Sequence, residues 1–142
     1  MDYAELFDTD VVRGYCAYIE QELLDQKQYE WLSYKKFPKQ SGIYMLRDIT
    51  GQIVYIGETS NIHDRLTHHQ NANGSALKNK IADYIQADPN SYLNECTITY
   101  LPMLLGRAEV EKYLISKYDP IFNNYNLRKR KIDKKCNNTI NI

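Results

Sequence analysis

The sequence predicts an α+β domain in which a small three-stranded antiparallel sheet is flanked by helices and preceded by an extra helix. Two runs rich in β-branched and aromatic residues, 43–47 and 52–57, are separated by a turn sequence. A third such run follows at 96–101, and helical periodicity recurs before, between and after these runs. The 142 residues are enough for one domain with its own core.

The first helix is expected from about Thr9 to Trp31. Its apolar residues recur at steps of three and four and are Val11, Val12, Tyr15, Tyr18, Ile19 and Leu23. This helix could pack on the core, join a partner subunit or hold DNA, and packing is the favoured interpretation. Residues 33–40, with Pro38 as a breaker, form a connector.

The runs 43–47 and 52–57 are interpreted as a β-hairpin, because Asp48–Gly51 between them ends in the glycine that a tight turn favours. If these four residues form the loop, Tyr44 lies directly opposite Tyr55 and the two side chains share one face of the sheet. A register slip of one residue would place them on opposite faces.

A helix from about 61 to 69 follows the hairpin, and Ser60 or Asn61 can cap it. Arg65 and His69 are four residues apart on this helix and therefore share a face. Two more helices are expected at about 75–86 and 106–118. On the helix at 75–86, the side chains expected to point inward are Leu77, Ile81, Tyr84 and Ile85, and those expected to point outward are Lys78, Lys80 and Asp83.

Composition constrains the class of protein. The formal net charge is zero, which weakens a prediction of nucleic-acid binding from composition alone, because such domains are often basic. The three scattered cysteines include no CxxC pair, so they indicate neither a zinc site nor a disulfide framework and favour a reducing, cytoplasmic location. The N-terminal sequence lacks the pattern of a signal peptide, and no apolar run is long enough to span a membrane.

The helix at 106–118 contains a carboxylate in an apolar stripe. Glu111, Leu114, Ile115 and Tyr118 are spaced i, i+3, i+4 and i+7 and share one face. A glutamate there is costly unless it is paired or bound to a metal. A salt bridge, for example with Arg65, and a metal site are both consistent with this pattern.

The segment 41–70 resembles the GIY-YIG endonuclease family. Gly42–Tyr44 and Tyr55–Gly57 reproduce the family's name-giving tripeptides letter for letter at hairpin spacing. Arg65 stands ten residues after the second tyrosine, as the family's catalytic arginine does. His69 falls where members carry a histidine or tyrosine near the scissile phosphate.

The resemblance continues beyond the hairpin. Glu111, Pro120 and Asn123 stand at spacings similar to those in the nuclease domain of the bacterial excision-repair protein UvrC, where the glutamate binds a metal. The resemblance implies the GIY-YIG nuclease fold at 41–126, with an N-terminal extension at 1–40 and a basic tail at 127–142 outside it. The implied activity is hydrolysis of DNA phosphodiester bonds by a divalent-metal-dependent endonuclease that uses Mg²⁺ or Mn²⁺.

The resemblance also assigns roles to six residues. Tyr55 is the favoured general base, although His69 could serve instead, and Tyr44 is expected to hydrogen-bond Tyr55 or the attacking water. Arg65 is expected to bind the scissile phosphate, Glu111 to bind the metal, and Asn123 to hold the site together. Further candidate DNA contacts are Arg47, Lys78, Arg128, Lys129, Arg130 and Lys131.

Glu58, directly after the second tripeptide, departs from the family, in which many members have a lysine or a small residue. It could bind a positive group, tune Tyr55 or simply be exposed. We expect a stand-alone nuclease of restriction, phage or mobile-element type, and a homodimer or larger oligomer if it cuts both strands. The alternative is a catalytically silent or partner-dependent nucleic-acid-binding or repair module, although a silent copy should have lost at least one catalytic residue.

Overall fold

A computed structural model describes residues 9–31, 37–71 and 75–125. Two segments precede the hairpin, α2 (Thr9–Leu24) and β1 (Tyr29–Glu30), and the hairpin itself consists of β2 (Gly42–Arg47) and β3 (Ile53–Thr59). The elements after it are α3 (Ile62–Asn71), α4 (Ala76–Ile85), α5 (Pro89–Leu93), β4 (Thr97–Pro102) and α6 (Arg107–Tyr118). The predicted α+β class is confirmed.

The antiparallel sheet has the strand order β1-β4-β2-β3 within the described residues. The three predicted strands are present, and the two-residue β1 adds a fourth at the edge. The predicted first helix is too long at its C-terminal end, because the chain leaves the helix at Leu24 and returns as β1. Tyr29 of β1 packs its ring 5.6 Å from Tyr100 and 5.7 Å from Phe37, centroid to centroid, and these contacts favour the strand.

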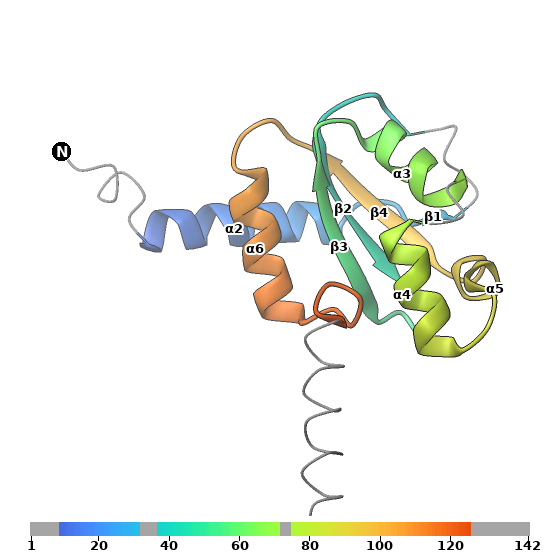
Figure 1. The fold of residues 1–142 in the computed structure, drawn as a ribbon. Coiled ribbons are helices and arrows are strands. Elements are labelled where there is room, and N and C mark those ends of the chain that lie inside the picture. Colours follow the sequence, from blue (N-terminus) through green and yellow to red (C-terminus); the bar gives the residue numbers. More distant parts are fainter. Residues whose placement is uncertain (1–8, 32–36, 72–74, 126–142) are drawn as a thin grey trace, which may run out of the picture.

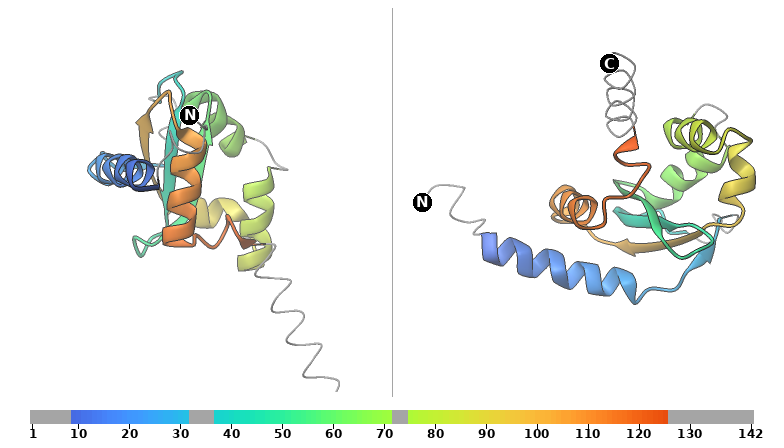
Figure 2. Two further views of the ribbon diagram at one scale, coloured as in Figure 1. Left: turned by 90° about the vertical axis from the view of Figure 1, so that its left-hand side faces the viewer. Right: turned by 90° about the horizontal axis from the view of Figure 1, so that it is seen from below.

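Helices cover both faces of the sheet, so all six residues of the central strand β2 are buried. Because strand side chains alternate between faces, Tyr44 and Leu46 enter a core beneath α3, α4 and α5, whereas Ile43 and Met45 enter a second core with α2 and α6. Figures 1 and 2 show α2 on one side of the strands, α3 and α4 on the other, and α6 beside β3.

The hairpin register differs from the prediction. Tyr44 pairs with Gly57, not with Tyr55, and Tyr55 pairs with Leu46. The Asp48 carboxylate accepts hydrogen bonds from the backbone N–H groups of Thr50 (2.9 Å) and Gln52 (3.1 Å), which holds a longer loop, and the register shifts again after Leu46. The displacement is two residues, so Tyr44 and Tyr55 still share a face, as predicted, but as diagonal neighbours.

The helix caps follow from the sequence. Asn61 caps α3 by accepting the N–H of Asp64 at 3.1 Å, and Ser75 caps α4 by accepting the N–H of Lys78 at 3.2 Å. Asp88 caps the short α5, a helix that sequence reasoning missed. Tyr84 was predicted to point inward, but it is 52% exposed and makes edge-on ring contacts with Phe122 and Tyr125.

The N-terminal helix α2 packs on the core, as favoured. Its buried residues Cys16, Ile19 and Leu23 share a cluster with residues of β2, β3 and α6. The Glu20 carboxylate, also buried, accepts hydrogen bonds from Lys117 (2.9 Å) and Tyr118 on α6. The division of the chain at residue 40 stays a prediction. Across the described ranges, no helix is both long and apolar enough to cross a membrane.

Candidate active site

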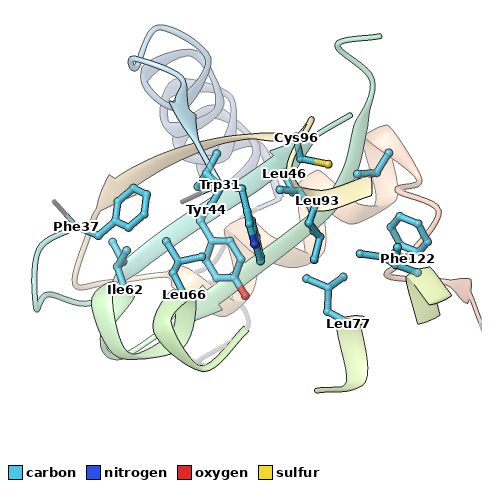
Figure 3. Packing of buried hydrophobic residues seen from close by; sticks show 13 residues of the cluster. Trp31, Phe37, Tyr44, Leu46, Ile62, Leu66, Leu77, Leu93, Cys96 and Phe122 are labelled. Atoms are coloured by element: carbon cyan, nitrogen blue, oxygen red, sulfur yellow. The ribbon is translucent and has the colours of Figure 1, made fainter. Parts of the chain in front are cut away.

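Three aromatic rings meet at the face of the hairpin beneath α3. Tyr44 and Tyr55 lie 6.1 Å apart, centroid to centroid, and His69 of α3 lies 6.1 Å from Tyr44 and 6.0 Å from Tyr55. The Tyr44 hydroxyl is 3.0 Å from His69 Nε2, within hydrogen-bond distance. Figure 3 shows the Tyr44 ring packed beside Leu66, within the cluster that also contains Ile62. The structure thus joins both motif tyrosines to the predicted histidine.

Gly57 provides the space for this arrangement. It pairs with Tyr44 across the hairpin, and a Cβ atom at position 57 would lie 2.4 Å from the Tyr44 hydroxyl oxygen and 2.5 Å from its ring carbon Cζ. Those distances are too short for any side chain. The glycine is therefore required here because the Tyr44 side chain crosses its partner strand at that point.

His69 is a neutral imidazole at physiological pH. Burial, followed by electrostatic interactions with Arg65, His68 and Lys78, lowers the pKa of His69 from 6.5 to about 4. Only 6% of the residue is exposed. Its Nδ1 atom is buried without a hydrogen-bond partner within the described segments. The ring is thus held available as a proton acceptor rather than as a cation.

The two tyrosines are held in their protonated forms. Burial and then Tyr55 raise the pKa of Tyr44 well above its usual value. Burial also raises the pKa of Tyr55, although hydrogen bonding with Tyr44 and the charge of Arg65 act in the opposite direction. The Arg65 charge therefore favours ionisation of Tyr55, but it does not overcome burial.

Arg65 projects from α3 into solvent. Its charge lowers the pKa of Tyr44, Tyr55, His69 and Glu111, in each case as a smaller cause than burial. The salt bridge with Glu111 considered from the sequence is not formed. In the part of the chain that the structure describes, the Arg65 guanidinium group has no ion-pair partner, so its donors are free for an anion such as phosphate.

Two side chains from the C-terminal part of the domain anchor β3 next to Tyr55. Asn123 accepts the Ile56 N–H through Oδ1 at 2.8 Å and donates Nδ2–H to the Ile56 carbonyl at 2.7 Å. Glu111 on α6 accepts the Glu58 N–H through Oε2 at 2.6 Å. Residues far apart in sequence therefore fix the backbone on both sides of Gly57.

The surroundings of Glu111 fit a hard divalent cation with few protein ligands. The described segments contain no group of three or more His, Cys, Asp or Glu residues that could hold a metal. Glu111 Oε1 has no donor among the described residues, and Mg²⁺ often binds through one or two carboxylates while keeping several waters. Burial, and then the nearby Glu58 carboxylate, outweigh the Glu58 N–H bond and raise the pKa of Glu111. A bound cation would favour the ionised carboxylate.

Glu58 binds a positive group, one of the three outcomes open from the sequence. Its carboxylate lies 3.5 Å from the guanidinium group of Arg107, at the start of α6. Sequence reasoning did not identify Arg107. Its position four residues before Glu111 could have suggested that both reach the same strand.

Two of the predicted DNA contacts are buried. Arg47 is 8% exposed and donates to the Thr99 hydroxyl at 2.6 Å, and Lys78 is 4% exposed and donates to the Gln70 carbonyl at 2.6 Å. The expectation that Lys78 points outward is wrong, because position 78 lies on the same helical stripe as the buried Ile81. Neither cation is free to contact a phosphate. The other four candidates, residues 128–131, lie outside the described residues.

Comparisons with known proteins agree with the motif. Residues 40–126 match the family model described as the GIY-YIG catalytic domain. The UvrABC system protein C of Bdellovibrio bacteriovorus is 30% identical over 101 residues, which cover 68% of this chain and 14% of that protein. The same protein from Rickettsia rickettsii is 32% identical over 91 residues, covering 61% of this chain and 12% of that protein.

The chain therefore spans only about one seventh of the length of these curated relatives. Among solved structures, the magnesium-bound GIY-YIG N-terminal endonuclease domain of UvrC from Thermotoga maritima is similar, with a TM-score of 0.48 and 20% identity over 63% of this chain and 89% of that chain. The family match covers more than half of the sequence and contains both tripeptides and all six residues of the predicted site. The chain belongs to the GIY-YIG family.

Proposed function

We propose that this protein is a divalent-metal-dependent endonuclease that hydrolyses phosphodiester bonds in DNA. The observation that supports this most directly is the convergence of Tyr44, Tyr55 and His69 within 6.1 Å of one another, with the charges of Arg65 and Glu111 close enough to shift the pKa of Tyr55. Few structural needs place a free arginine, a carboxylate and coupled hydroxyl groups together, whereas phosphate hydrolysis uses all of them.

In the proposed reaction, a water oxygen forms a bond to phosphorus, and the bond from phosphorus to the leaving oxygen breaks. Negative charge grows on the phosphate as this happens. The exposed guanidinium group of Arg65 binds those oxygens and stabilises the charge. Glu111 would hold a divalent cation, which when bound would add positive charge near the phosphate.

The attacking water must lose a proton, and the aromatic residues offer a path. Tyr55 takes that proton as its own hydroxyl proton passes to Tyr44, whose proton passes to His69 Nε2 at 3.0 Å. Hydroxyl protons rotate freely enough to serve such a chain. A neutral His69 is required at its end, and the lowered pKa of His69 supplies this at physiological pH. Tyr55 acting alone would have to be a phenolate, which its raised pKa disfavours.

Asn123 acts through the backbone. Its amide uses one donor and one acceptor on Ile56, which fixes the strand that carries Tyr55. We assign it a positioning role. Glu111 fixes Glu58 in the same way through Oε2, so Oε1 would be the oxygen left to hold a cation.

DNA binding is proposed to depend partly on the basic tail. Residues 127–142 contain six Lys and Arg and one Asp, although the whole chain is neutral. Cations that neutralise phosphates give affinity that falls steeply with salt. A single catalytic set cuts one strand at a time, so double-strand cleavage would require a second copy of the chain or a second visit.

The proposal is tested with supercoiled plasmid DNA incubated with the protein and Mg²⁺ or Mn²⁺, beside an EDTA control. The informative variant is Glu111→Gln, since the amide oxygen can still accept the Glu58 N–H. The matched control is Glu109→Gln, on the exposed side of the same helix. Metal-dependent nicking or linearisation that survives in Glu109→Gln but is lost in Glu111→Gln is the expected result.

Two outcomes would contradict the proposal. Equal cutting by the Glu111→Gln variant would remove Glu111 from the chemistry. Binding of DNA without cutting, with either metal and on both single- and double-stranded substrates, would instead favour the catalytically silent module. RNA oligonucleotides in the same assay show whether the substrate is DNA alone.

A further inference from the structure

Lys78 is a buried ammonium group that the proposed chemistry does not use. It stands in the first turn of α4, only 4% exposed, and donates from Nζ to the Gln70 carbonyl at 2.6 Å. Gln70 belongs to the last turn of α3 and directly follows His69. One side chain therefore connects the start of α4 to the end of the helix that carries Arg65 and His69.

The position is unfavourable for a lysine unless this contact offsets the cost. Burying an ammonium group is expensive without a partner, and a cation in the first turn of α4 opposes the dipole of that helix. The last carbonyl groups of α3 lack hydrogen-bond partners within their own helix, and the C-terminus of a helix attracts positive charge. The contact with α3 thus offsets the free-energy cost of burying a cation in the first turn of α4.

The end of α3 is held by a second contact, also through Gln70. Gln70 donates from Nε2 to the carbonyl of Trp31, a buried residue that follows directly after β1. His69 lies between these anchors and the tyrosines, with Nε2 3.0 Å from the Tyr44 hydroxyl. A small rotation of the last turn of α3 would break that contact, because hydrogen bonds weaken steeply with distance and angle.

We propose that Lys78 is a positioning residue for the active site, whose buried ammonium group holds the last turn of α3 and thereby sets His69 against Tyr44. Its contribution to cleavage rests on the proposed function, whereas its hold on α3 does not. Its charge also acts on His69 directly, as one of the causes that keep the imidazole neutral. The groups that face His69 are Tyr44 from β2, Tyr55 from β3, Arg65 and His68 from α3, and Lys78 from α4.

The first measurement uses the unmodified protein and needs no cleavage. NMR spectroscopy of the lysine side chains should show one ammonium group, that of Lys78, whose protons exchange slowly with water because they are buried and hydrogen-bonded. The matched reference is Lys80, two residues along α4 and partly exposed, whose ammonium protons should exchange too fast to observe. A Lys78 signal that exchanges as fast as that of Lys80 would overturn the proposal.

The second measurement compares Lys78→Met with Lys78→Arg and Lys80→Met. In Lys78→Met, amide exchange at residues 69–71 should accelerate at least roughly 10-fold, since these residues lose their anchor. The pKa of His69, followed by its ring proton shifts, should rise. In Lys78→Arg, which keeps a buried donor, the amide exchange rates and the pKa of His69 should lie close to the parent values. Lys80→Met should change neither quantity.

The third measurement is kinetic. In Lys78→Met, kcat for cleavage should fall by roughly 10-fold to 100-fold with KM little changed, because a misplaced catalytic group slows the reaction without weakening substrate binding. Unchanged kcat, His69 pKa and amide exchange in Lys78→Met would refute the proposal. If the parent protein cuts no nucleic acid, the proposed function fails, but amide exchange and the His69 titration still decide the role of Lys78. If Lys78→Met does not fold, the ammonium exchange in the parent decides it.

Discussion

Replacing Gly57 with alanine tests whether the second tripeptide needs its glycine for steric reasons. The added Cβ would lie 2.4 Å from the Tyr44 hydroxyl oxygen and 2.5 Å from Cζ. Tyr44 cannot move aside easily, because it is only 2% exposed and packs in a cluster with Ile62 and Leu66. Such overpacking costs about 1–3 kcal/mol, and loss of the contact with His69 adds about 1 kcal/mol.

Alanine recovers part of that loss, because glycine in a strand costs about 0.5–1 kcal/mol of conformational entropy relative to alanine. The net expectation for Gly57→Ala is a decrease of about 1–3.5 kcal/mol in the free energy of unfolding. Urea denaturation followed by fluorescence measures it, since the single tryptophan, Trp31, belongs to the same buried cluster as Tyr44. Cleavage activity should fall at the same time, because Tyr44 leaves its position.

Two controls separate crowding from other effects. Gly14→Ala, where an added Cβ meets nothing within 4 Å on the exposed face of α2, should stabilise the protein by about 1 kcal/mol through helix propensity. In a Tyr44→Phe background, the ring carbon at 2.5 Å remains, so Gly57→Ala should still lower the free energy of unfolding by most of the same amount. A Gly57→Ala protein as stable as the parent would refute the steric reasoning.

Three further predictions concern the pH dependence of stability, phosphate binding and the N-terminal helix. The pKa of His69 is about 4 in the folded protein, compared with 6.5 for a histidine in the unfolded chain, so the unfolded chain binds the proton more readily. The contribution of His69 to the free energy of unfolding should be complete above about pH 6.5 and fall by about 3 kcal/mol on acidification to pH 4. Urea denaturation at a series of pH values should show this decrease in the parent protein but not in His69→Phe. Arg65→Ala should reduce cleavage at least roughly 100-fold while changing stability by about 0.5 kcal/mol or less, and retention of near-normal rates would exclude its role. Glu20→Gln should destabilise the protein by about 1–2 kcal/mol by weakening the contacts with Lys117 and Tyr118, measured by urea denaturation, and an unchanged midpoint would show that α2 is held by its apolar face alone.

The parts of the fold that sequence reasoning predicted correctly are those with local signals. The hairpin, α3, α4, β4 and α6 each have a periodic apolar pattern, a capping residue or a glycine turn within their own segment. The elements it missed, β1 and α5, are two and five residues long, too short for periodicity to appear. The strand β1 exists because Tyr29 finds Tyr100 and Phe37, which are distant in sequence.

The same distinction applies to the site. The two tripeptides and the spacing of Arg65 and His69 are local, so the shared face of the tyrosines could be predicted. Their register could not be predicted, because it depends on which backbone N–H groups of the loop the Asp48 carboxylate accepts hydrogen bonds from. Lys78 was placed outward by its charge, although its position on the helix already put it on the inward stripe. Position on the helix therefore predicts burial better than charge does when the end of a second helix offers a carbonyl group to the buried cation.

The arrangement of the site also determines which substitution of Glu111 is informative. Glu111 and Asn123 support the backbone of β3, so truncating either should disturb the strand as well as the chemistry. Glu111→Gln keeps an oxygen of the same size for the Glu58 N–H at 2.6 Å and removes mainly the negative charge. The amide therefore separates the two roles proposed for the carboxylate. A loss of cleavage with unchanged stability would assign its charge to cation binding, whereas a parallel loss of both would assign Glu111 to the support of the strand.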